Sequence, residues 1–297
     1  MEYATVSLKN SRTIALPSQE ADLIKIFYHK YKTERNTKMF NKLGLQLYTI
    51  RNTMNNATEI EESYAKLQSL GYTEAHTAGL PKVTDEEFVA LAKKYGISII
   101  GTHYDYGRII NSPDETMKIH EIYDTTNVGI GGMPSDARTD YDSLMKFIEN
   151  FNKTAEIYAK NGFKLTYHNH SFEFIRINEN KTIMDYLYEQ FDPKNISFVL
   201  DTCWVQHGGA DVRYWMEKLA GRIDILHLKD IKPYYDANGK VTQTMTEIGN
   251  GNIYWEGVLE TAEKIGVKHY IVEQDICPVD PFESLKTSAD YLAKYLK

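Results

Sequence analysis

The sequence predicts an α/β fold, a single-domain (β/α)₈ or TIM barrel, and two observations predict it. First, eight short apolar, β-rich runs alternate with longer segments of helical periodicity, which is the pattern of βα units around a parallel sheet. Second, the eight units occupy about 255 residues, the usual size of a closed barrel. A doubly wound open sheet has fewer strands, and the phosphate-binding patterns GxGxxG and GxxxxGK[ST] are absent from the sequence.

The predicted strands follow one another from residue 43 to the C-terminal region. Their sequences are LGLQLY (43–48), YTEAHT (72–77), ISIIGTHY (97–104), NVGIGGM (127–133), FKLTYHNH (163–170), ISFVLDT (196–202), IDILHLKD (223–230) and HYIVEQD (269–275). Between them lie amphipathic segments, several of which end in the glycine expected just past a helix C-terminus. These segments cover residues 57–71, 84–96, 141–162, 254–266 and 281–296. The turn-rich segment 232–252 is long enough to form a loop over an active site.

The first 38 residues differ in composition from the rest of the chain. They are polar, become basic towards their end and contain one short periodic run, from Ala21 to Tyr31. Met39 directly precedes the segment FNKLGLQLY, where the regular patterning begins. We therefore expect residues 1–38 to be a poorly ordered N-terminal extension or a mis-assigned start, and residues 39–297 to form the barrel domain.

Composition and charge narrow the class of partner. With 42% apolar and 25% charged residues the chain has the composition of a soluble globular protein. A net charge of −7 without a long basic run argues against a nucleic-acid groove. Only Cys203 and Cys277 are present, which is typical of a reducing cytoplasm. No apolar run approaches the ~20 residues of a membrane span, and no signal-peptide pattern is present.

Polar residues gather at the ends of the predicted strands. In a parallel barrel the active site lies at the carboxyl ends of the strands. The residues found there are Gln46, Tyr48, His76, His103, His168, His170, Asp201, His227 and Glu273. A single histidine at such a position is more often a structural residue, but five of the nine histidines lie at strand ends. This clustering predicts a functional site.

Four of these residues, His168, Asp201, His227 and Glu273, lie on four successive predicted strands. Two imidazoles and two carboxylates suit a borderline or hard divalent ion such as Mn²⁺, Fe²⁺, Co²⁺, Zn²⁺ or Mg²⁺. Such an ion would keep open positions for substrate oxygens, so the pattern predicts a catalytic metal. The alternative is structural, with carboxylates that cap loops and histidines that donate to backbone carbonyls.

The segments LGLQLYTIRN, YHNHSFEF, LDTCWVQHGGADV, RIDILHLKD and EIGNGNIYWEGVLETAEKIGVKHYIVEQD resemble the sugar phosphate isomerase/epimerase family. These xylose-isomerase-like barrels include tagatose 3-epimerase-like enzymes and inosose dehydratases. The resemblance runs from about Met39 to the C-terminus. It implies a (β/α)₈ barrel that holds one divalent ion, most often Mn²⁺, with Asp201, His227 and Glu273 at the positions of the usual ligands.

Two positions depart from the family pattern. Many relatives carry Glu-Asn-His on the fifth strand where this chain has His168-Asn169-His170, which is closer to the Tyr-His-x-His run of dehydratase-like members. The sixth-strand motif often continues Asp-Thr-x-His, whereas Trp204 stands in place of that histidine. In the family's epimerases the fifth-strand Glu is one of two acid/base groups on opposite faces of the substrate. Its loss weakens the epimerase interpretation in particular.

We therefore expect a divalent-metal-dependent isomerase or epimerase of a keto-sugar or related polyol that acts through an enediolate. The alternative within the same chemistry is a lyase or dehydratase of a keto-inositol or a 3-keto-glycoside. The alternative of another class is a non-catalytic sugar-binding barrel. In the catalytic interpretations Glu273 is the base, and Glu173 and His170 are candidates for the second acid/base group.

Further side chains are candidates for substrate binding. They are His76 and His103 for sugar hydroxyls, Trp204 as a flat wall, Lys229 for an anion or enediolate, and Glu247 ahead of the GNGN turn. An ion pair between Lys229 and Asp230 is the structural alternative for that lysine. Because only Lys229 and Arg51 supply positive charge near the site, we expect an unphosphorylated sugar or polyol. A homo-oligomer is compatible with these predictions.

Overall fold

The computed structural model describes residues 3–8, 12–17, 38–79 and 81–297, which belong to two units, Met1–Met39 and Phe40–Lys297. In the first unit, β1 (Tyr3–Leu8) pairs antiparallel with β2 (Arg12–Pro17). The periodic run 21–31 lies outside the described residues. The second unit contains all the predicted strands and is described below by itself.

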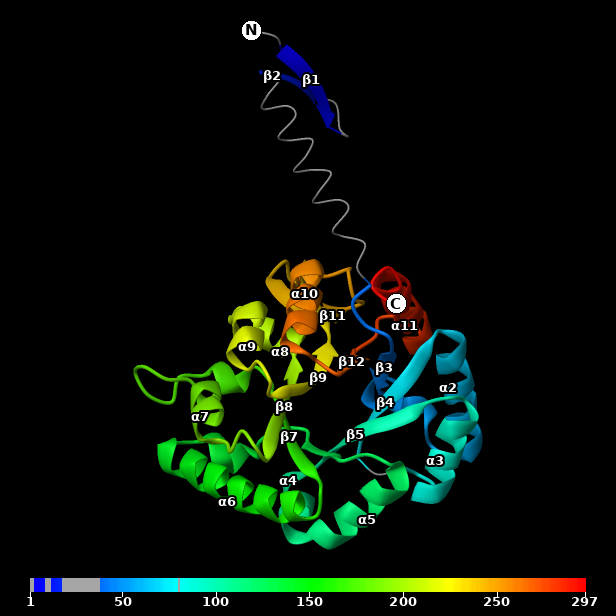
Figure 1. Ribbon diagram of the computed structural model, residues 1–297, viewed down its shortest axis with the longest axis vertical. Coiled ribbons are helices and arrows are strands. Elements are labelled where there is room, and N and C mark those ends of the chain that lie inside the picture. The colour runs from blue at the N-terminus through cyan, green and yellow to red at the C-terminus, as the bar shows by residue number, and fades with distance from the viewer. Residues whose placement is uncertain (1–2, 9–11, 18–37, 80) are drawn as a thin grey trace. The chain divides into compact units, whose positions relative to one another are not determined.

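Eight parallel strands of the second unit close into a barrel, with helices around the outside (Figure 1). The order around the ring is β12-β3-β4-β5-β6-β7-β8-β9. The strands are β3 (Leu43–Gln46), β4 (Tyr72–Ala78), β5 (Ser98–Tyr104), β6 (Asn127–Ile130), β7 (Lys164–His168), β8 (Ile196–Asp201), β9 (Ile223–Leu228) and β12 (His269–Val272). All eight predicted runs supply a barrel strand, so the (β/α)₈ prediction is confirmed.

The connections between strands are mostly helical. They are η2 (Leu47–Thr53), α2 (Ala57–Ser69), α3 (Asp85–Lys94), α4 (Tyr106–Asn111), α5 (Pro113–Tyr123), η3 (Ser135–Arg138), α6 (Tyr141–Lys160), η4 (Phe172–Phe174), α7 (Ile183–Gln190), α8 (Thr202–His207), α9 (Val212–Lys218), α10 (Trp255–Ile265) and α11 (Pro281–Leu292). Polar residues begin several of them: Asn56 caps α2, Thr84 caps α3, and Asp140 forms a capping box with Ser143 on α6. Among the described residues, none of the helices combines the length and apolar character needed to cross a bilayer.

The barrel interior is apolar just below the carboxyl ends of the strands. A buried cluster there consists of Ile100, Val199, Ile225 and Ile271. Residues two positions apart on a strand share a face. Three members of the cluster therefore share a face with the polar residue two positions later: Val199 with Asp201, Ile225 with His227, and Ile271 with Glu273. The polar end of the barrel lies one layer above a water-excluding apolar layer.

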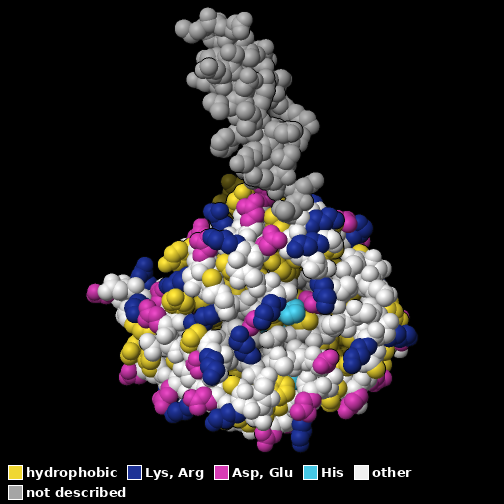
Figure 2. All heavy atoms as spheres, in the orientation of Figure 1, with side chains coloured by type: hydrophobic (Ala, Val, Ile, Leu, Met, Phe, Trp, Pro, Cys, Tyr) yellow, Lys and Arg dark blue, Asp and Glu magenta, His cyan; other side chains and the backbone are white. Residues whose placement is uncertain are grey.

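The segment between the seventh and eighth barrel strands is more regular than its turn-rich sequence suggests. Strand β10 (Asp230–Tyr235) pairs antiparallel with β11 (Val241–Thr246), so much of the expected loop is a hairpin. On the face that Figure 2 shows, basic side chains alternate with acidic ones and form no continuous basic track.

Asp230, at the start of this hairpin, is a fully buried carboxylate that organises the chain after β11. Its Oδ2 accepts hydrogen bonds from the backbone N–H groups of Gly249 (2.9 Å) and Gly251 (3.1 Å) and from the indole N–H of Trp255 (2.6 Å). Its Oδ1 accepts from the backbone N–H of Ile253 at 3.3 Å. The carboxylate therefore ties the GNGN turn to the end of β9.

Two glycines of the turn are required by this arrangement. A Cβ at Gly251 would lie 2.1 Å from Oδ1 of Asp230, so a side chain there would push the backbone off the carboxylate. Gly249 has a φ of 90°, a conformation that L side chains rarely adopt. The repeated glycines of GNGN are thus explained by close approach and backbone conformation.

The buried carboxylate of Asp230 gives a stability prediction. Substitution Asp230→Ala removes the acceptor of several buried N–H groups, and we expect it to lower the free energy of unfolding by about 3 to 5 kcal/mol. Urea denaturation followed by circular dichroism measures this. The matched control is Asp236→Ala, since Asp236 accepts backbone N–H bonds of residues 238 and 240 in the exposed hairpin turn, where we expect a loss of about 1 kcal/mol. Equal losses in the two variants would contradict the assignment.

Candidate metal centre and substrate cavity

Sheet register brings the four predicted ligands to one end of the barrel. Asp201 on β8 lies beside His227 on β9. His227 in turn lies beside Ile271 on β12, two residues before Glu273. His168 ends β7, which neighbours β8 in the ring. Four consecutive strands therefore deliver one side chain each, as the spacing in the sequence predicts.

The four side chains converge. One ligand atom from each of His168, Asp201, His227 and Glu273 can be chosen so that all lie within 4.8 Å of one another, and all four residues are buried. His227 Nδ1 is 2.9 Å from Oε2 of Glu273, and His168 Nε2 is 3.4 Å from Oδ2 of Asp201. Ligands about 2.1 Å from one ion are separated by about 3 to 4 Å. The cluster therefore has nearly the dimensions of a coordination shell.

The charges in this cluster also suit a cation. Three carboxylates, those of Asp201, Glu273 and Asp275, lie around the ammonium group of Lys229. One positive charge faces three negative charges, which leaves two for a divalent cation to neutralise. Donor type, spacing and charge together fit a divalent ion.

Lys229 itself does not make the predicted alternative ion pair with Asp230. Its Nζ donates to Oδ1 of Asp275 at 2.8 Å and to Oε2 of Glu273 at 3.3 Å, and lies 3.5 Å from Oδ2 of Asp201. Burial lowers the pKa of the lysine, but the charges of Glu273, Asp201 and Asp275 outweigh this and raise its pKa above its ordinary value. The side chain is therefore a permanent cation at 1% exposure.

The same charges act on the carboxylates. Burial alone would raise the pKa of Glu273, but Lys229 and His227 hold that pKa well below its ordinary value. Burial, and next to it the charge of Glu273, raise the pKa of Asp275. Glu273 is therefore ionised and available to a cation or a substrate proton.

The histidines of the cluster differ in their electrostatics. Burial lowers the pKa of His227, and it lowers the pKa values of His76 and His103 further. Burial also acts on His168, but its hydrogen bond to Asp201 and the charge of that carboxylate raise its pKa. Neutral imidazoles are the form that ligates metals.

A cavity of about 290 Å³ opens above the cluster. It is lined by Gln46, Tyr48, Ala78, His103, Gly131, His168, His170, Trp204, Lys229, Glu273 and Asp275. Six predicted site residues thus share one cavity: His103, His168, His170, Trp204, Lys229 and Glu273. The sequence analysis did not select Asp275, although it follows Glu273 by two residues and so shares its side of the chain. Ala78 and Gly131 carry no chemical group that could have marked them.

The wall formed by His170 and Trp204 has unused hydrogen-bonding atoms. Nδ1 of His170 and Nε1 of Trp204 are buried and have no hydrogen-bond partner among the described residues. The two rings lie 5.4 Å apart between centroids. Burial lowers the pKa of His170 to about 3, so this imidazole is neutral at ordinary pH. A ligand oxygen in the cavity would satisfy both atoms.

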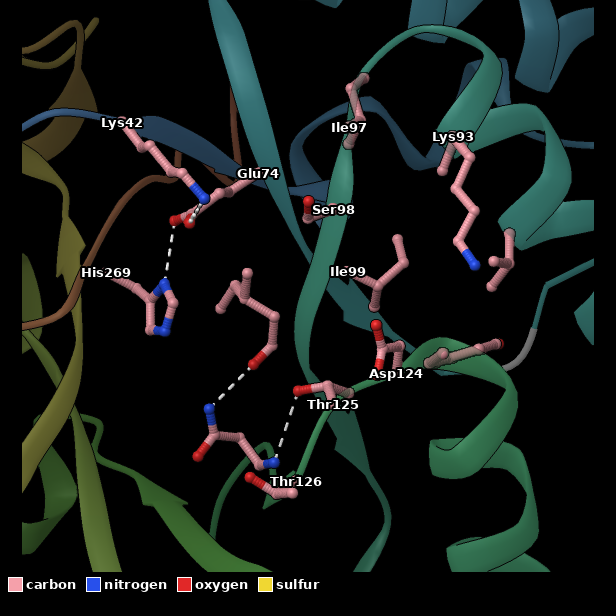
Figure 3. A pocket seen from close by; sticks show the side chains of 15 residues that line it. Lys42, Glu74, Lys93, Ile97, Ser98, Ile99, Asp124, Thr125, Thr126 and His269 are labelled. Atoms are coloured by element: carbon pink, nitrogen blue, oxygen red, sulfur yellow. Dashed lines mark hydrogen bonds and ion pairs between the residues drawn. The ribbon is translucent and has the colours of Figure 1, made fainter.

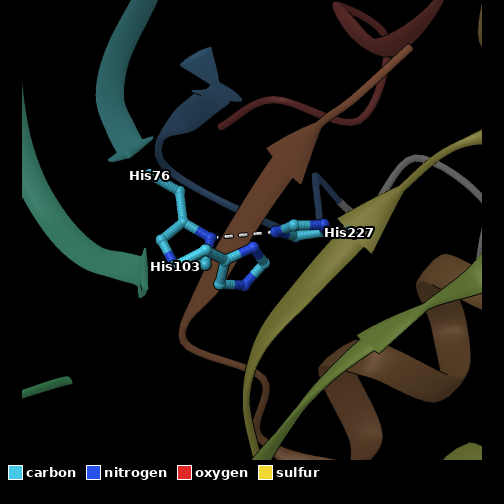
Figure 4. A group of neighbouring side chains, drawn as sticks. All are labelled: His76, His103 and His227. Atoms are coloured by element: carbon cyan, nitrogen blue, oxygen red, sulfur yellow. Dashed lines mark hydrogen bonds between the residues drawn. The ribbon is translucent and has the colours of Figure 1, made fainter. Parts of the chain in front are cut away.

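Five predicted residues lie outside the cavity lining: the proposed ligands Asp201 and His227, and His76, Glu173 and Glu247. His76 is below it, in contact with His227 (Figure 4). The carboxylate of Glu173 accepts hydrogen bonds from the hydroxyl of Tyr167 (2.6 Å) and from the backbone N–H of His170 (2.8 Å).

Glu247 is also held by hydrogen bonds to residues outside the cavity. Its carboxylate accepts hydrogen bonds from the side chains of Ser284, Thr246 and Asn250. Burial opposes ionisation, but these hydrogen bonds and that of its own backbone lower the pKa of Glu247 to about 2. The structure places this carboxylate against α11 and the GNGN turn, away from the residues that line the cavity.

A second cavity, of about 360 Å³, lies at the opposite end of the barrel (Figure 3). Part of its charged lining is already paired, since Glu74 contacts His269 at 3.0 Å and Lys42 at 3.5 Å. It is formed by the amino ends of strands, where residues serve stability more often than catalysis. The carboxyl-end cavity is therefore the better candidate for chemistry.

Comparison with known proteins identifies the family of this barrel. The profile of the family described as xylose isomerase-like TIM barrel matches residues 62–295. An inosose dehydratase of Geobacillus thermodenitrificans (strain NG80-2) is 28% identical over 160 residues, which are 49% of this chain and 52% of the relative. The chain thus spans about half the length of that curated relative.

Solved structures show the same fold. A sugar phosphate isomerase/epimerase from Parabacteroides distasonis ATCC 8503 aligns with a TM-score of 0.71 and 23% identity, over 86% of this chain and 100% of that one. The probable 3-DHS dehydratase of Bacillus anthracis aligns with a TM-score of 0.65 and 14% identity, over 85% of this chain and 98% of that one. At these identities the likeness is one of fold. With the family profile over most of the barrel, the conclusion is that this chain belongs to the xylose isomerase-like TIM barrel family.

Proposed function

We propose that this protein is a divalent-metal-dependent lyase that eliminates water, or another β-oxygen substituent, from a neutral keto-polyol such as a keto-inositol or a 3-keto-glycoside. The observation that carries this proposal is the unequal fate of the two glutamates predicted to be catalytic. Glu273 lines the cavity beside the cluster, whereas Glu173 is hydrogen-bonded outside it. The proposal also draws on the inosose dehydratase named above.

The cavity favours a neutral substrate. Around it the carboxylates of Asp201, Glu273 and Asp275 outnumber the ammonium of Lys229. A divalent ion would balance these charges and leave none for a phosphate dianion. Arg51 is held by the backbone carbonyls of Tyr48 and Asp275. A polyol, whose hydroxyls donate and accept, matches the unpartnered nitrogen atoms of His170 and Trp204 described above.

The ion would be held by His168, Asp201, His227 and Glu273, and when bound it would supply a Lewis acid for the negative charge that develops on a substrate carbonyl oxygen. His227 and Lys229 both contact Oε2 of Glu273, which leaves Oε1 free of these contacts. We therefore assign to Oε1 the removal of the substrate proton. Lys229 keeps this carboxylate ionised before it reacts.

The elimination then balances as follows. Glu273 takes the proton from the carbon next to the carbonyl, and the electron pair of that C–H bond forms a carbon–carbon double bond as the β C–O bond breaks. The departing oxygen takes a proton from His170, whose neutral ring carries one N–H and lines the cavity. The leaving group is then water or an alcohol. The proton that Glu273 took returns through solvent to restore the N–H of His170, so no proton is gained or lost overall.

An isomerase or epimerase, which the sequence analysis places first, is the second candidate. It is favoured by the position of His170, two residues past the end of β7, because β7 is three places from β12 in the eight-stranded ring and His170 therefore lines the cavity from another side than Glu273. A proton returned from that side would give an epimer. A second carboxylate at that position, as the family's epimerases have, is replaced here by His168.

The first test identifies the product. With Mn²⁺ and a keto-inositol or a 3-keto-glycoside in D₂O, we expect an unsaturated product lighter by water or by the released alcohol. Glu273→Gln should lower the rate about 10²- to 10⁴-fold, and Glu247→Gln is the matched control that keeps the wild-type rate. Recovery of substrate isomers of unchanged composition that carry deuterium would instead establish the isomerase.

The second test concerns the ion. We expect about one divalent ion per chain in purified wild-type protein, and an affinity more than ~100-fold weaker in Asp201→Ala, because a ligand is lost. Elemental analysis and chelator competition measure both quantities. Asp224→Ala is the control, since Asp224 is a buried carboxylate at the other end of β9, paired with Lys164 and Lys268. Equal metal content in wild type and Asp201→Ala would refute the metal assignment.

The third test concerns Glu173, which burial makes a weak acid by raising its pKa to about 8 despite the hydrogen bonds from Tyr167 and His170. The folded state therefore holds a proton that the unfolded state releases above pH ~4.5. Stability should be fully present below that pH and decline as the pH rises towards 8, by about 1.4 kcal/mol for each unit of pKa shift as an upper limit.

Glu173→Gln should flatten this decline, as measured by urea denaturation at a series of pH values. Glu247→Gln is again the control, because the pKa of Glu247 is shifted in the other direction and its contribution changes only below pH ~4.5. An unchanged slope between pH 5 and 8 in Glu173→Gln would show that this carboxyl group is not the cause.

A further inference from the structure

Three histidines lie together at the base of the cavity, near the ends of β4, β5 and β9; two are buried and one, His103, lines the cavity. They are His76, His103 and His227 (Figure 4). Nδ1 of His76 is 2.9 Å from Nε2 of His227, and the rings of His76 and His103 lie 4.3 Å apart between centroids. Gly101 has no side chain that would press on the ring of His76, since a Cβ there would lie 3.2 Å from it. The role of His76 depends on where the protons of this group are.

The side-chain amide of Gln46 fixes those protons. The backbone N–H of Tyr48 donates to Oε1 of Gln46 at 3.4 Å, which sets the orientation of the amide. Its Nε2 consequently faces two rings, at 3.5 Å from Nδ1 of His76 and 3.3 Å from Nδ1 of His103. An amide NH₂ can only donate. Both Nδ1 atoms must therefore be acceptors, which carry a lone pair and no proton.

This assignment propagates to His227. Because Nδ1 of His76 is an acceptor, the 2.9 Å contact is a hydrogen bond only if Nε2 of His227 carries the proton. In the neutral ring, Nδ1 of His227 then presents a lone pair. That atom lies 2.9 Å from Oε2 of Glu273, which is also an acceptor. Two acceptors at this distance need a proton or a metal ion between them, and the distance is that expected for adjacent ligands of one ion.

We propose that Gln46 and His76 are positioning residues that hold His227 in the tautomer whose Nδ1 binds the ion. The inference rests on the proposed metal site and extends it inward by two residues. It also assigns the three histidines to one ion, since the amide hydrogens of Gln46 point at the lone pairs that a second ion would need. His76 acts on the ion through His227, and the sugar hydroxyls are left to residues that line the cavity.

The test compares two substitutions at one position. In His76→Asn the side-chain oxygen replaces Nδ1 as acceptor, whereas His76→Leu keeps bulk and offers none. We expect the affinity for Zn²⁺ or Mn²⁺, measured by chelator competition, to fall about 10- to 100-fold in His76→Leu and to remain near wild type in His76→Asn. The control is His120→Leu, because His120 is equally buried but bonds to Thr102 and Thr125 outside the site, and its affinity should not change.

A second measurement needs no substitution and so does not depend on the folding of a variant. In the Zn²⁺-loaded wild-type protein, ¹⁵N NMR of the histidine rings should show His227 metallated at Nδ1 and protonated at Nε2. Metallation at Nε2 would overturn the proposal. Wild-type affinity in a folded His76→Leu protein would do the same, and so would two ions per wild-type chain with one lost in His76→Leu, because His76 would then be a ligand.

These outcomes separate the two proposals. If the wild-type protein binds no divalent ion, the proposed function fails together with the inference that rests on it. If wild type binds one ion and His76→Leu binds it equally well, the metal site stands and only the positioning role of Gln46 and His76 is lost.

Discussion

Concentration of negative charge at one buried end of the barrel is the constraint on which the site depends. Asp201 ends β8, Glu273 and Asp275 follow β12, and the three carboxylates would repel one another in the absence of positive charge. Lys229 supplies part of it from the middle of the group and holds Glu273 in the ionised state. The remaining charge is the basis on which we propose a divalent ion and a neutral, hydroxyl-rich substrate.

The barrel and the location of its site could be predicted because both depend on periodicity. Eight β-rich runs separated by helical segments predict the fold, and polar residues at the ends of these runs predict which end of the barrel carries the candidate site. This pattern does not predict how deeply a side chain lies in the barrel or which residues it contacts. His76 ends a strand as His103 does, yet it lies under the cavity and contacts His227. The positions of Glu173 and Glu247 could not be predicted because their hydrogen-bond partners are not marked in the sequence. Tyr167 on β7 donates to Glu173, and Ser284 on the distant helix α11 donates to Glu247.

The two departures from the family pattern acquire a physical meaning in the structure. The family resemblance implies a carboxylate at position 168 in many relatives; a histidine there brings no negative charge, so the cluster holds less negative charge than a two-glutamate site. Trp204 brings a wall of the cavity with one N–H donor, 5.0 Å between its ring centroid and the ammonium of Lys229. Both changes favour a site with one carboxylate base, Glu273, and the neutral imidazole of His170 over a site with two acid/base carboxylates.

The apolar layer formed by Ile100, Val199, Ile225 and Ile271 closes the axis of the barrel directly beneath the cluster. The proposed ion could then reach the four ligands only from the carboxyl ends of the strands, through the same opening that a polyol substrate would use. An ion would load before the polyol and depart after it, so a saturated protein would exchange its metal slowly. Substrate bound at this opening would therefore slow the removal of the proposed ion by chelators, because the four aliphatic side chains block the route through the barrel.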